Sequence, residues 1–250
     1  MKQKNKIYFA SDFHLGAPSI ENKKEHEKVV VEWLDYISSD AKEIYLVGDI
    51  FDFWFEYKKV IPKGNTRFLG KLCELVDKGI EINYFTGNHD IWIFDYLPNE
   101  VGVKVFKKPV VKIIDNKKFF IAHGDGLTKY EKSYNLLKSV FTNPFAQWLF
   151  RILHPDLGVK IAYAWSKKSR EGNVDKPKSQ FKGEEEWLFK WAKETAEHTH
   201  YDYYLFGHRH VAIKMDINKN SDLYFLGDWI NLFSYAVWDG NELELKYFKK

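Results

Sequence analysis

Five short clusters of polar residues in this sequence combine the side chains that hold metal ions in proteins. They are Asp12-Phe13-His14, Gly48-Asp49-Ile50-Phe51-Asp52, Gly87-Asn88-His89-Asp90, His123-Gly124-Asp125 and Gly207-His208-Arg209-His210. Any one of them alone fits an ordinary loop, because Asp, Asn, Gly and His all favour turns. Each cluster, however, comes shortly after an apolar run. We therefore interpret the five as parts of one site.

The donor atoms of these clusters indicate which ions they suit. The oxygen donors are Asp12, Asp49 and the amide of Asn88, and the nitrogen donors are the imidazoles of His14, His123, His208 and His210. This mixture, which lacks a thiolate, suits Mn²⁺, Fe²⁺ or Zn²⁺ better than it suits a structural cysteine–zinc site. Seven ligands exceed the needs of one ion. We expect two ions that share Asp49, one oxygen each, with open positions left for water and a substrate.

The elements that must position these side chains alternate between strand and helix. Short apolar runs predict strands buried on both faces at residues 7–10, 44–47, 82–85, 119–122 and 203–206. Helical patterns cover 25–38 and 66–78. This alternation predicts α/β layers, in which the carboxyl ends of neighbouring strands open onto one crevice.

Two later regions have a different pattern. Residues 211–217, 223–227, 234–238 and 243–248 predict consecutive strands joined by turns at 218–220 and 239–241, and thus a second, largely antiparallel sheet. Residues 130–191 carry apolar positions compatible with short helices that Pro144, Pro155 and Gly158 divide. We predict one domain over residues 1–250, with a helical insertion at 130–191.

Composition narrows the class of protein. The chain has 250 residues, a hydrophobic fraction of 45% and a net charge of +3, which is too mild to predict a nucleic-acid partner. Its one cysteine, Cys73, allows no disulfide within the chain, which suits a reducing cytosol. The start has no signal-peptide pattern, and no apolar stretch reaches the roughly 18 residues of a spanning helix. We expect a soluble or peripheral cytoplasmic protein.

The five clusters, in this order along the whole chain, resemble the signature blocks of the calcineurin-like metallophosphoesterases. The resemblance implies an α/β fold, an αββα sandwich of two mixed sheets, with the helical insertion as a cap. It also implies a ligand set for each ion. One ion would take Asp12, His14, Asp49 and His210, and the other Asp49, Asn88, His123 and His208.

The same resemblance implies catalytic roles beside the ligands. His89 would stabilise the phosphoryl oxygens or protonate the leaving oxygen, and Asp90 would hold its ring in orientation. Asp52 and Asp125 would accept imidazole N–H groups. An equally simple alternative is that Asp52 and Asp125 are turn residues that cap loop amides.

Within this superfamily, residues 48–54, 123–127 and 226–229, together with the insertion, resemble the UDP-2,3-diacylglucosamine hydrolases of lipid A biosynthesis. That resemblance implies cleavage of the pyrophosphate of an acylated UDP-sugar into UMP and 2,3-diacylglucosamine 1-phosphate. It further implies Mn²⁺ as the metal and a peripheral position on the inner face of the cytoplasmic membrane. His89 is a departure, since the best-known members carry arginine there. The implied substrate contacts are Asn88, His89, Glu131, Ser166, Arg170 and His208.

The insertion has residues that suit such a substrate. Apolar walls for acyl chains could come from Phe141, Phe145, Trp148, Leu149, Phe150, Ile152, Leu153 and Trp165, and cations for a diphosphate from Lys167, Lys168 and Arg170. The alternative is that this apolar stripe packs onto the protein's own core. Two other functions stay open: a soluble phosphomonoesterase or phosphodiesterase acting on another substrate, and a metal-free binding scaffold.

Overall fold

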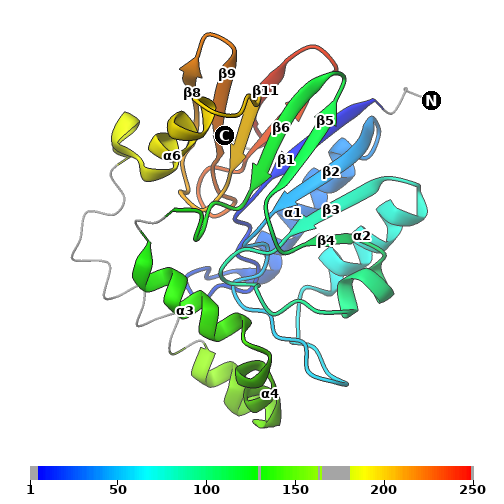
Figure 1. Ribbon diagram of the computed structural model, residues 1–250. Helices are drawn as coiled ribbons and strands as arrows, with labels where there is room; N and C mark the ends of the chain where they lie inside the picture. The colour runs from blue at the N-terminus through cyan, green and yellow to red at the C-terminus, as the bar shows by residue number, and fades with distance from the viewer. Residues whose placement is uncertain (1–4, 129–130, 163, 165–180, 249–250) are drawn as a thin grey trace.

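Two mixed β-sheets stacked face to face form the centre of the protein. The computed structural model describes residues 5–128, 131–162, 164 and 181–248 (Figure 1). The six-stranded sheet has the order β11-β10-β1-β2-β3-β4. Its strands are β1 (Lys6–Ala10), β2 (Ala41–Val47), β3 (Glu81–Phe85), β4 (Lys104–Phe106), β10 (Ser234–Trp238) and β11 (Leu243–Tyr247).

The five-stranded sheet has the order β5-β6-β7-β9-β8. Its strands are β5 (Val110–Ile114), β6 (Lys117–Ala122), β7 (Tyr203–Phe206), β8 (Ala212–Asn218) and β9 (Ser221–Leu226). In this sheet β6, β7 and β9 run parallel to one another, whereas β5 and β8 are antiparallel strands at the two edges. Parallel strands therefore occupy the middle of the sheet.

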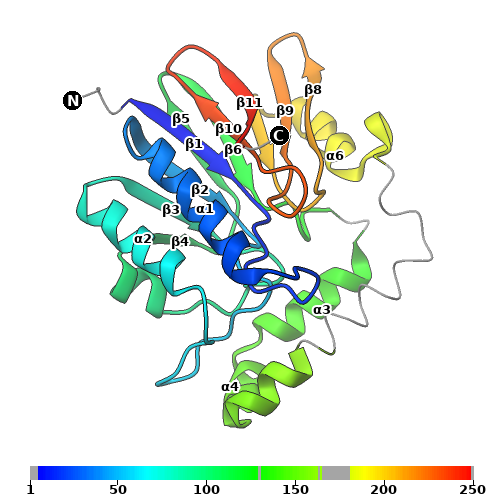
Figure 2. The same cartoon turned by 180° about the vertical axis from the view of Figure 1, so that it is seen from behind.

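Helices α1 (Lys23–Ile37) and α2 (Thr66–Asp77) connect the parallel strands β1, β2 and β3, as parallel pairing requires. The Asn22 side chain accepts the Glu25 N–H at 3.1 Å and caps the start of α1. Both helices bury their apolar faces on the outer side of the six-stranded sheet, with Trp33 and Phe68 in that core (Figure 2). A short π-helix, Leu97–Val101, follows before β4.

A second core fills the space between the sheets, and a third lies beneath α6 (Trp187–Ala196). Between the sheets, the Phe9 ring stacks on Tyr45 and Phe119, at centroid distances of 4.9 and 5.9 Å. Helix α6 buries Leu188 and Phe189 on the outer face of the five-stranded sheet. The order helix, sheet, sheet, helix confirms the expected αββα sandwich.

The last four strands do not form one separate antiparallel sheet, so that prediction was wrong. Strands β8 and β9 pair with each other and extend the five-stranded sheet, while β10 pairs antiparallel with β1 in the other sheet. The physical reason is that β1 would otherwise be an exposed edge with unpaired backbone groups, and β10 covers it. The predicted turns at 218–220 and 239–241 do connect β8 to β9 and β10 to β11.

The expected insertion contains α3 (Lys132–Thr142), α4 (Pro144–Ile152) and the 3-10 turn Gly183–Glu185. Asn143 separates the two helices, and its side chain accepts the N–H groups of Phe145 and Ala146, which starts α4 behind Pro144. Figure 1 shows α3 and α4 projecting from the sandwich. Residues 187–191 belong to α6 and pack on the sheet, so the projecting part ends before α6. No described helix is long and apolar enough to cross a membrane.

Candidate metal centre

The five polar clusters come together at one end of the stacked sheets. Asp12 and Asp49 follow β1 and β2, Asn88 follows β3, and His123 and His208 follow β6 and β7 of the other sheet. The Asn88 amide oxygen lies 3.3 Å from His123 Nε2, so candidate ligands from the two sheets meet directly. Both sheets thus contribute loops to a single site.

One group of candidate ligands surrounds Asp12. Its Oδ1 lies 3.4 Å from His210 Nε2 and 3.6 Å from His14 Nε2. Its Oδ2 accepts hydrogen bonds from the Ser11 hydroxyl and from the His208 N–H, which leaves Oδ1 facing the two imidazoles. Asp12 Oδ1 and His14 Nε2 are buried without a hydrogen-bond partner among the described residues. Two orphaned atoms aimed at one point are what a cation would satisfy.

A second group surrounds Asn88. Its amide oxygen lies 3.0 Å from His208 Nδ1, and His123 Nε2 lies 3.3 Å from Asp49 Oδ2. Asp49, His123 and His208 each place one possible ligand atom within 4.8 Å of those of the other two. The same is true of Asp12, His14 and His210. The predicted ligands therefore divide between two neighbouring positions.

Asp49 lies between the two groups. Its Oδ2 is 3.3 Å from His123 Nε2 and 3.9 Å from His14 Nε2, while its Oδ1 accepts the His89 N–H at 2.8 Å. This geometry favours one oxygen shared between both positions over the expected arrangement of one oxygen for each ion.

Three imidazoles have an oxygen of the surrounding structure close to Nδ1, which leaves Nε2 to face the site. His14 Nδ1 lies 3.4 Å from Asp52 Oδ1, His123 Nδ1 lies 2.9 Å from the Val47 carbonyl, and His210 Nδ1 lies 3.3 Å from Asp228 Oδ2. Partners of this kind fix ring orientation in metal sites. Sequence reasoning anticipated Asp52 but missed Val47 and Asp228. The signal for Asp228 was its place just beyond the end of a strand, the position that the other clusters share.

Several candidate ligands adopt a backbone conformation that L-residues rarely take. The φ angles of Asp12, His14, Asp49, His208 and His210 lie between 47° and 65°. Such strain concentrates at functional sites, where the surroundings impose it. Close approach also requires glycine at Gly87 and Gly207, where a Cβ would stand 2.2 Å from Asp49 Oδ1 and 1.9 Å from Ser11 Oγ. The donors, their orientation and the orphaned atoms all fit divalent metal ions.

Comparison with known proteins agrees with this geometry. The calcineurin-like phosphoesterase family matches residues 5–212. This chain belongs to that family. It is 43% identical over 255 residues to the UDP-2,3-diacylglucosamine hydrolase of Porphyromonas gingivalis (strain ATCC BAA-308 / W83), covering 97% of both chains. It is 26% identical over 227 residues to the enzyme of that name from Actinobacillus succinogenes, covering 90% of this chain and 92% of the other.

Among solved structures, the chain is similar to YfcE, a phosphoesterase from E. coli, with a TM-score of 0.48 and 14% identity. The alignment covers 97% of this chain and 92% of YfcE. Membership of the calcineurin-like phosphoesterases confirms the resemblance inferred from the five clusters. It also confirms the reaction class, a metal-dependent phosphoric-ester hydrolase, and thereby implies that the protein binds divalent metal ions.

Electrostatics in this phosphoesterase favour a bound cation. Burial opposes ionisation of Asp12, but His210 and His14 lower its pKa to about 2. Burial likewise opposes protonation of His14, yet the nearby carboxylates of Asp12, Asp52 and Asp49 raise its pKa to about 10. Burial and the neighbouring His123 lower the pKa of His208 to about 4, which keeps that ligand neutral. The buried carboxylates thus attract positive charge, which a divalent ion would supply.

His89 and Asp90 are placed differently from what the sequence suggested. Asp90 is fully buried, and its carboxylate accepts the Tyr84 hydroxyl at 2.6 Å and the N–H groups of Gly87 and Ile50 at 2.7 and 2.9 Å. The His89 ring instead bonds the Asp52 carbonyl through Nδ1 at 2.9 Å. Asp90 therefore fixes the loops that carry Asp49 and Asn88, and it does not orient the His89 ring as expected.

Asp125 also differs from its expected role as an imidazole acceptor. Its Oδ2 accepts the Tyr134 hydroxyl and Lys138 Nζ, the latter at 2.6 Å, and both partners lie on α3. Glu131 accepts the Gly126 N–H at 3.0 Å. These contacts attach the start of the projecting helices to the loop that carries His123. The other expected substrate contacts in the insertion, Ser166 and Arg170, lie outside the described residues.

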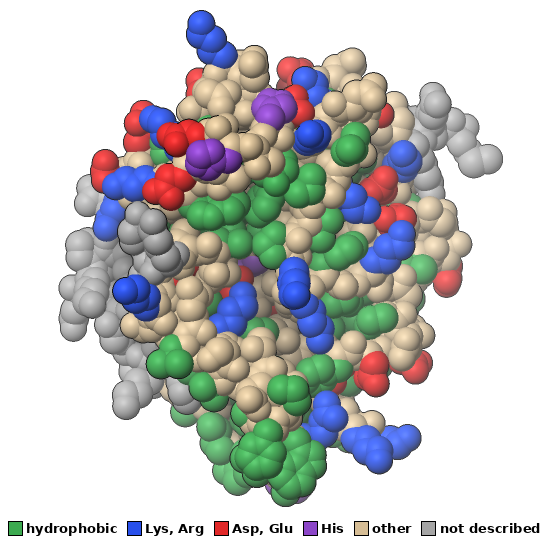
Figure 3. All heavy atoms as spheres, viewed as in Figure 1, with side chains coloured by type: hydrophobic (Ala, Val, Ile, Leu, Met, Phe, Trp, Pro, Cys, Tyr) green, Lys and Arg blue, Asp and Glu red, His purple; other side chains and the backbone are tan. Residues whose placement is uncertain are grey.

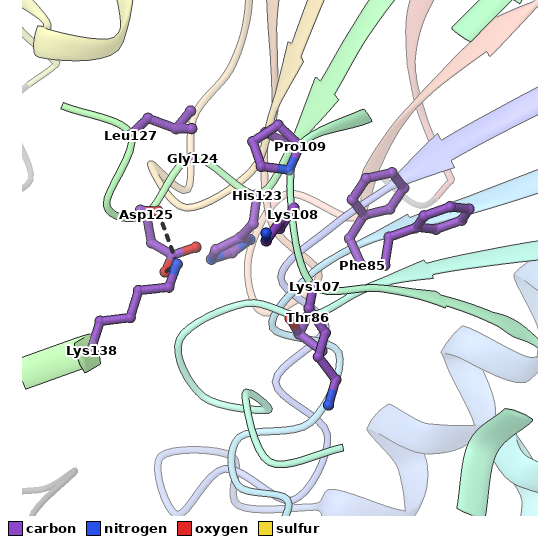
Figure 4. Close-up of a pocket in the computed structure, with 12 residues that line it drawn as sticks. Phe85, Thr86, Lys107, Lys108, Pro109, His123, Gly124, Asp125, Leu127 and Lys138 are labelled. Carbon is purple, nitrogen blue, oxygen red and sulfur yellow. Dashed lines mark hydrogen bonds and ion pairs between the residues drawn. The ribbon is translucent and has the colours of Figure 1, made fainter. Parts of the chain in front are cut away.

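A small cleft of about 30 Å³ lies beside His123, bounded by Lys138 on one side and by Lys107 and Lys108 on the other (Figure 4). This volume holds only a few water molecules. A larger open groove of about 420 Å³ shares Phe106 and the two lysines and extends to Phe94. Sequence reasoning did not single out Lys107 and Lys108, which place positive charge near the metal centre.

Proposed function

We propose that this protein hydrolyses the pyrophosphate of UDP-2,3-diacylglucosamine to UMP and 2,3-diacylglucosamine 1-phosphate. The observation that carries the proposal is the 43% identity to the P. gingivalis enzyme over 97% of both chains. The complete set of metal-ligand side chains supports it, because a scaffold without metal would have no need to bury Asp12 and Asp49 beside four imidazoles.

The proposed ligands of one ion are Asp12, His14, Asp49 and His210, and those of the other are Asp49, Asn88, His123 and His208. We propose Mn²⁺ as the native ion, with Fe²⁺ or Zn²⁺ as alternatives for the same oxygen and imidazole donors. When bound, the pair of ions would supply Lewis-acid stabilisation of phosphoryl charge. The chain itself would orient the ligands through Asp52, Asp228 and the Val47 carbonyl.

His89 is the proposed catalytic side chain that is not a ligand. Its ring is about one-fifth exposed, and the bond from Nδ1 to the Asp52 carbonyl leaves Nε2 available to a substrate. A donor held in this way could protonate the leaving oxygen or stabilise a phosphoryl oxygen. We assign Asp90 a positioning role, because its carboxylate binds Gly87, just before the Asn88–His89 pair.

Acyl chains are proposed to contact α4. The two faces of this helix differ: the Phe150 ring packs on Phe55 and Trp92, at 4.7 and 5.1 Å, whereas Phe145 and Trp148 are 66% and 55% exposed. Phe141 also packs on Trp92, at 5.2 Å. Phe141 and Phe150 therefore pack onto the protein itself, as the alternative to a lipid-binding role expects. The exposed face, which includes Leu149 and Ile152, remains available to a lipid.

This exposed face also supports a peripheral position on the inner face of the cytoplasmic membrane. Figure 3 shows hydrophobic side chains gathered on the projecting part of the molecule, where α4 lies in the same view of Figure 1. Exposed apolar residues there include Leu136, Val140, Phe145, Trp148, Leu149, Ile152, Leu157 and Ile161. Contiguous apolar patches of this kind mark lipid or protein contact sites.

The decisive experiment compares three substrates with purified, Mn²⁺-loaded protein: UDP-2,3-diacylglucosamine, UDP-N-acetylglucosamine and bis(p-nitrophenyl) phosphate. The proposal expects UMP release from the diacylated substrate at a kcat/KM far above that for the other two. Equal rates on the diacylated and unacylated sugars would favour the soluble phosphoesterase. Absence of bound metal by elemental analysis, together with no turnover, would favour the binding scaffold.

A further inference from the structure

Arg209 lies between two metal-ligand histidines and makes a two-pronged ion pair with Glu186. Arg209 Nε donates to Glu186 Oε2 at 2.9 Å, and Arg209 Nη2 donates to Oε1 at 2.7 Å. The Glu186 side chain is 1% exposed and that of Arg209 19%. The pair therefore connects the loop of His208 and His210 to the residue that precedes α6.

The first turn of α6 also contacts two loops of the Asn88 group, those that carry His208 and His123. The Trp187 ring lies 6.1 Å from the His208 ring, and a Cβ on Gly124, beside His123, would stand 3.0 Å from Leu188. Glu186 is itself held, because its Oε1 accepts the Lys182 N–H at 3.0 Å. The ion pair thus anchors Arg209 to a fixed part of the sandwich.

Stability alone is a poor explanation for this pair. A buried ion pair often contributes no more to stability than apolar residues of the same size. A guanidinium–carboxylate pair with two parallel bonds does fix position and direction. The residues on either side of Arg209 need such a restraint, since His208 and His210 have φ angles of 65° and 50°.

One anchor at Arg209 serves both metal positions. His208 lies against Asn88 in one group, and His210 lies against Asp12 in the other. We infer that Arg209 and Glu186 are positioning residues of the metal centre, whose ion pair holds the His208 and His210 imidazoles in ligand geometry. This inference rests on the proposed metal centre and adds a role for two residues that are not ligands.

The test measures Mn²⁺ binding to the full-length apo-protein by titration calorimetry. It compares wild type, Arg209→Gln, Glu186→Gln and the double variant. Each single variant should lose about 10- to 100-fold in Mn²⁺ affinity, the usual effect of removing a partner that orients a ligand. The double variant should lose no more Mn²⁺ affinity than the single variant that binds Mn²⁺ more weakly, because the two residues act as a unit.

Lys190→Gln is the matched control. It removes the ion pair between Lys190 and Glu185, which joins α6 to the turn before it but is exposed to solvent. Its Mn²⁺ affinity should equal that of wild type. If the buried pair served stability alone, the variants that remove it would have a lower melting temperature and an unchanged Mn²⁺ affinity. Turnover of a small diester by Arg209→Gln should recover at high Mn²⁺, which a folding defect would not allow.

Arg209→Lys keeps the charge but cannot make the two-pronged contact, so it provides the measurement if Arg209→Gln does not fold. It should also bind Mn²⁺ more weakly than wild type. Wild-type affinity in folded Arg209→Lys or Arg209→Gln, or additive losses in the double variant, would overturn the inference. Failure of the wild-type chain to bind Mn²⁺ would instead overturn the metal centre on which it rests.

Discussion

Asp49 Oδ2 lies 3.3 Å from His123 Nε2, although Asp49 follows β2 of one sheet and His123 follows β6 of the other. The same oxygen lies 3.9 Å from His14 Nε2 in the neighbouring group. A single carboxylate oxygen therefore joins the two sheets and the two candidate metal positions. Its removal should disturb both positions at once.

Asp49→Ala should abolish turnover and weaken binding of both ions, because no neighbouring carboxylate can replace the shared oxygen. Elemental analysis of the purified variant checks this expectation. Asp77→Ala, at the exposed end of α2, is the control and should keep both ions. Two ions at wild-type stoichiometry in Asp49→Ala would refute the bridging assignment.

His89→Ala should keep its metal but lose turnover by roughly 10²–10⁴-fold, the range for removal of a general acid or a stabiliser of transition-state charge. His89 is the residue to test, because it also lies within ligand distance of His14 and Asp49. Parallel measurements of metal content and of kcat distinguish the two roles. Loss of an ion from the variant would make His89 a ligand instead.

The double variant Trp148→Ser and Leu149→Ser should impair hydrolysis of the diacylated UDP-sugar much more than hydrolysis of a small chromogenic diester. Each fully buried apolar contact with an acyl chain is worth about 1.5–3 kcal/mol, or roughly ten- to one-hundred-fold in kcat/KM. The two side chains are 55% and 48% exposed, so their replacement should cost little stability.

Ile113→Ser is the control for that variant, since Ile113 is 69% exposed on β5 and should affect neither substrate. Equal losses on both substrates in the double variant, with unchanged metal content, would favour the soluble-phosphoesterase function. Thermal denaturation of all variants would reveal any general loss of packing.

Removal of metal by a chelator should lower the melting temperature, and Mn²⁺ should restore it. The buried atoms Asp12 Oδ1 and His14 Nε2 have no hydrogen-bond partner in the described part of the chain, and a bound cation would give them one. An ion that binds the folded chain alone stabilises it by about 2.7 kcal/mol at one hundred times its Kd. A melting temperature that does not respond to Mn²⁺ would contradict the proposed centre.

The sequence alone was sufficient to predict the candidate ligands and the elements that carry them. Ligand chemistry is a property of individual residue types, and a polar cluster at the end of an apolar strand is visible within a few residues. Both helices expected at 25–38 and 66–78 are present, as are all five strands that precede the clusters. For the same reason the order and content of the five clusters were enough to infer the family.

Only the tertiary structure decided which distant groups meet. Strands β8–β9 and β10–β11 belong to two different sheets, Asp228 pairs with His210, and Asp125 anchors α3. No local sequence pattern indicates any of these three pairings. The two faces of α4 could not be separated either, since an apolar helical stripe looks the same whether it faces the core or solvent. Packing between segments far apart in the chain sets these relationships, and local periodicity carries no information about it.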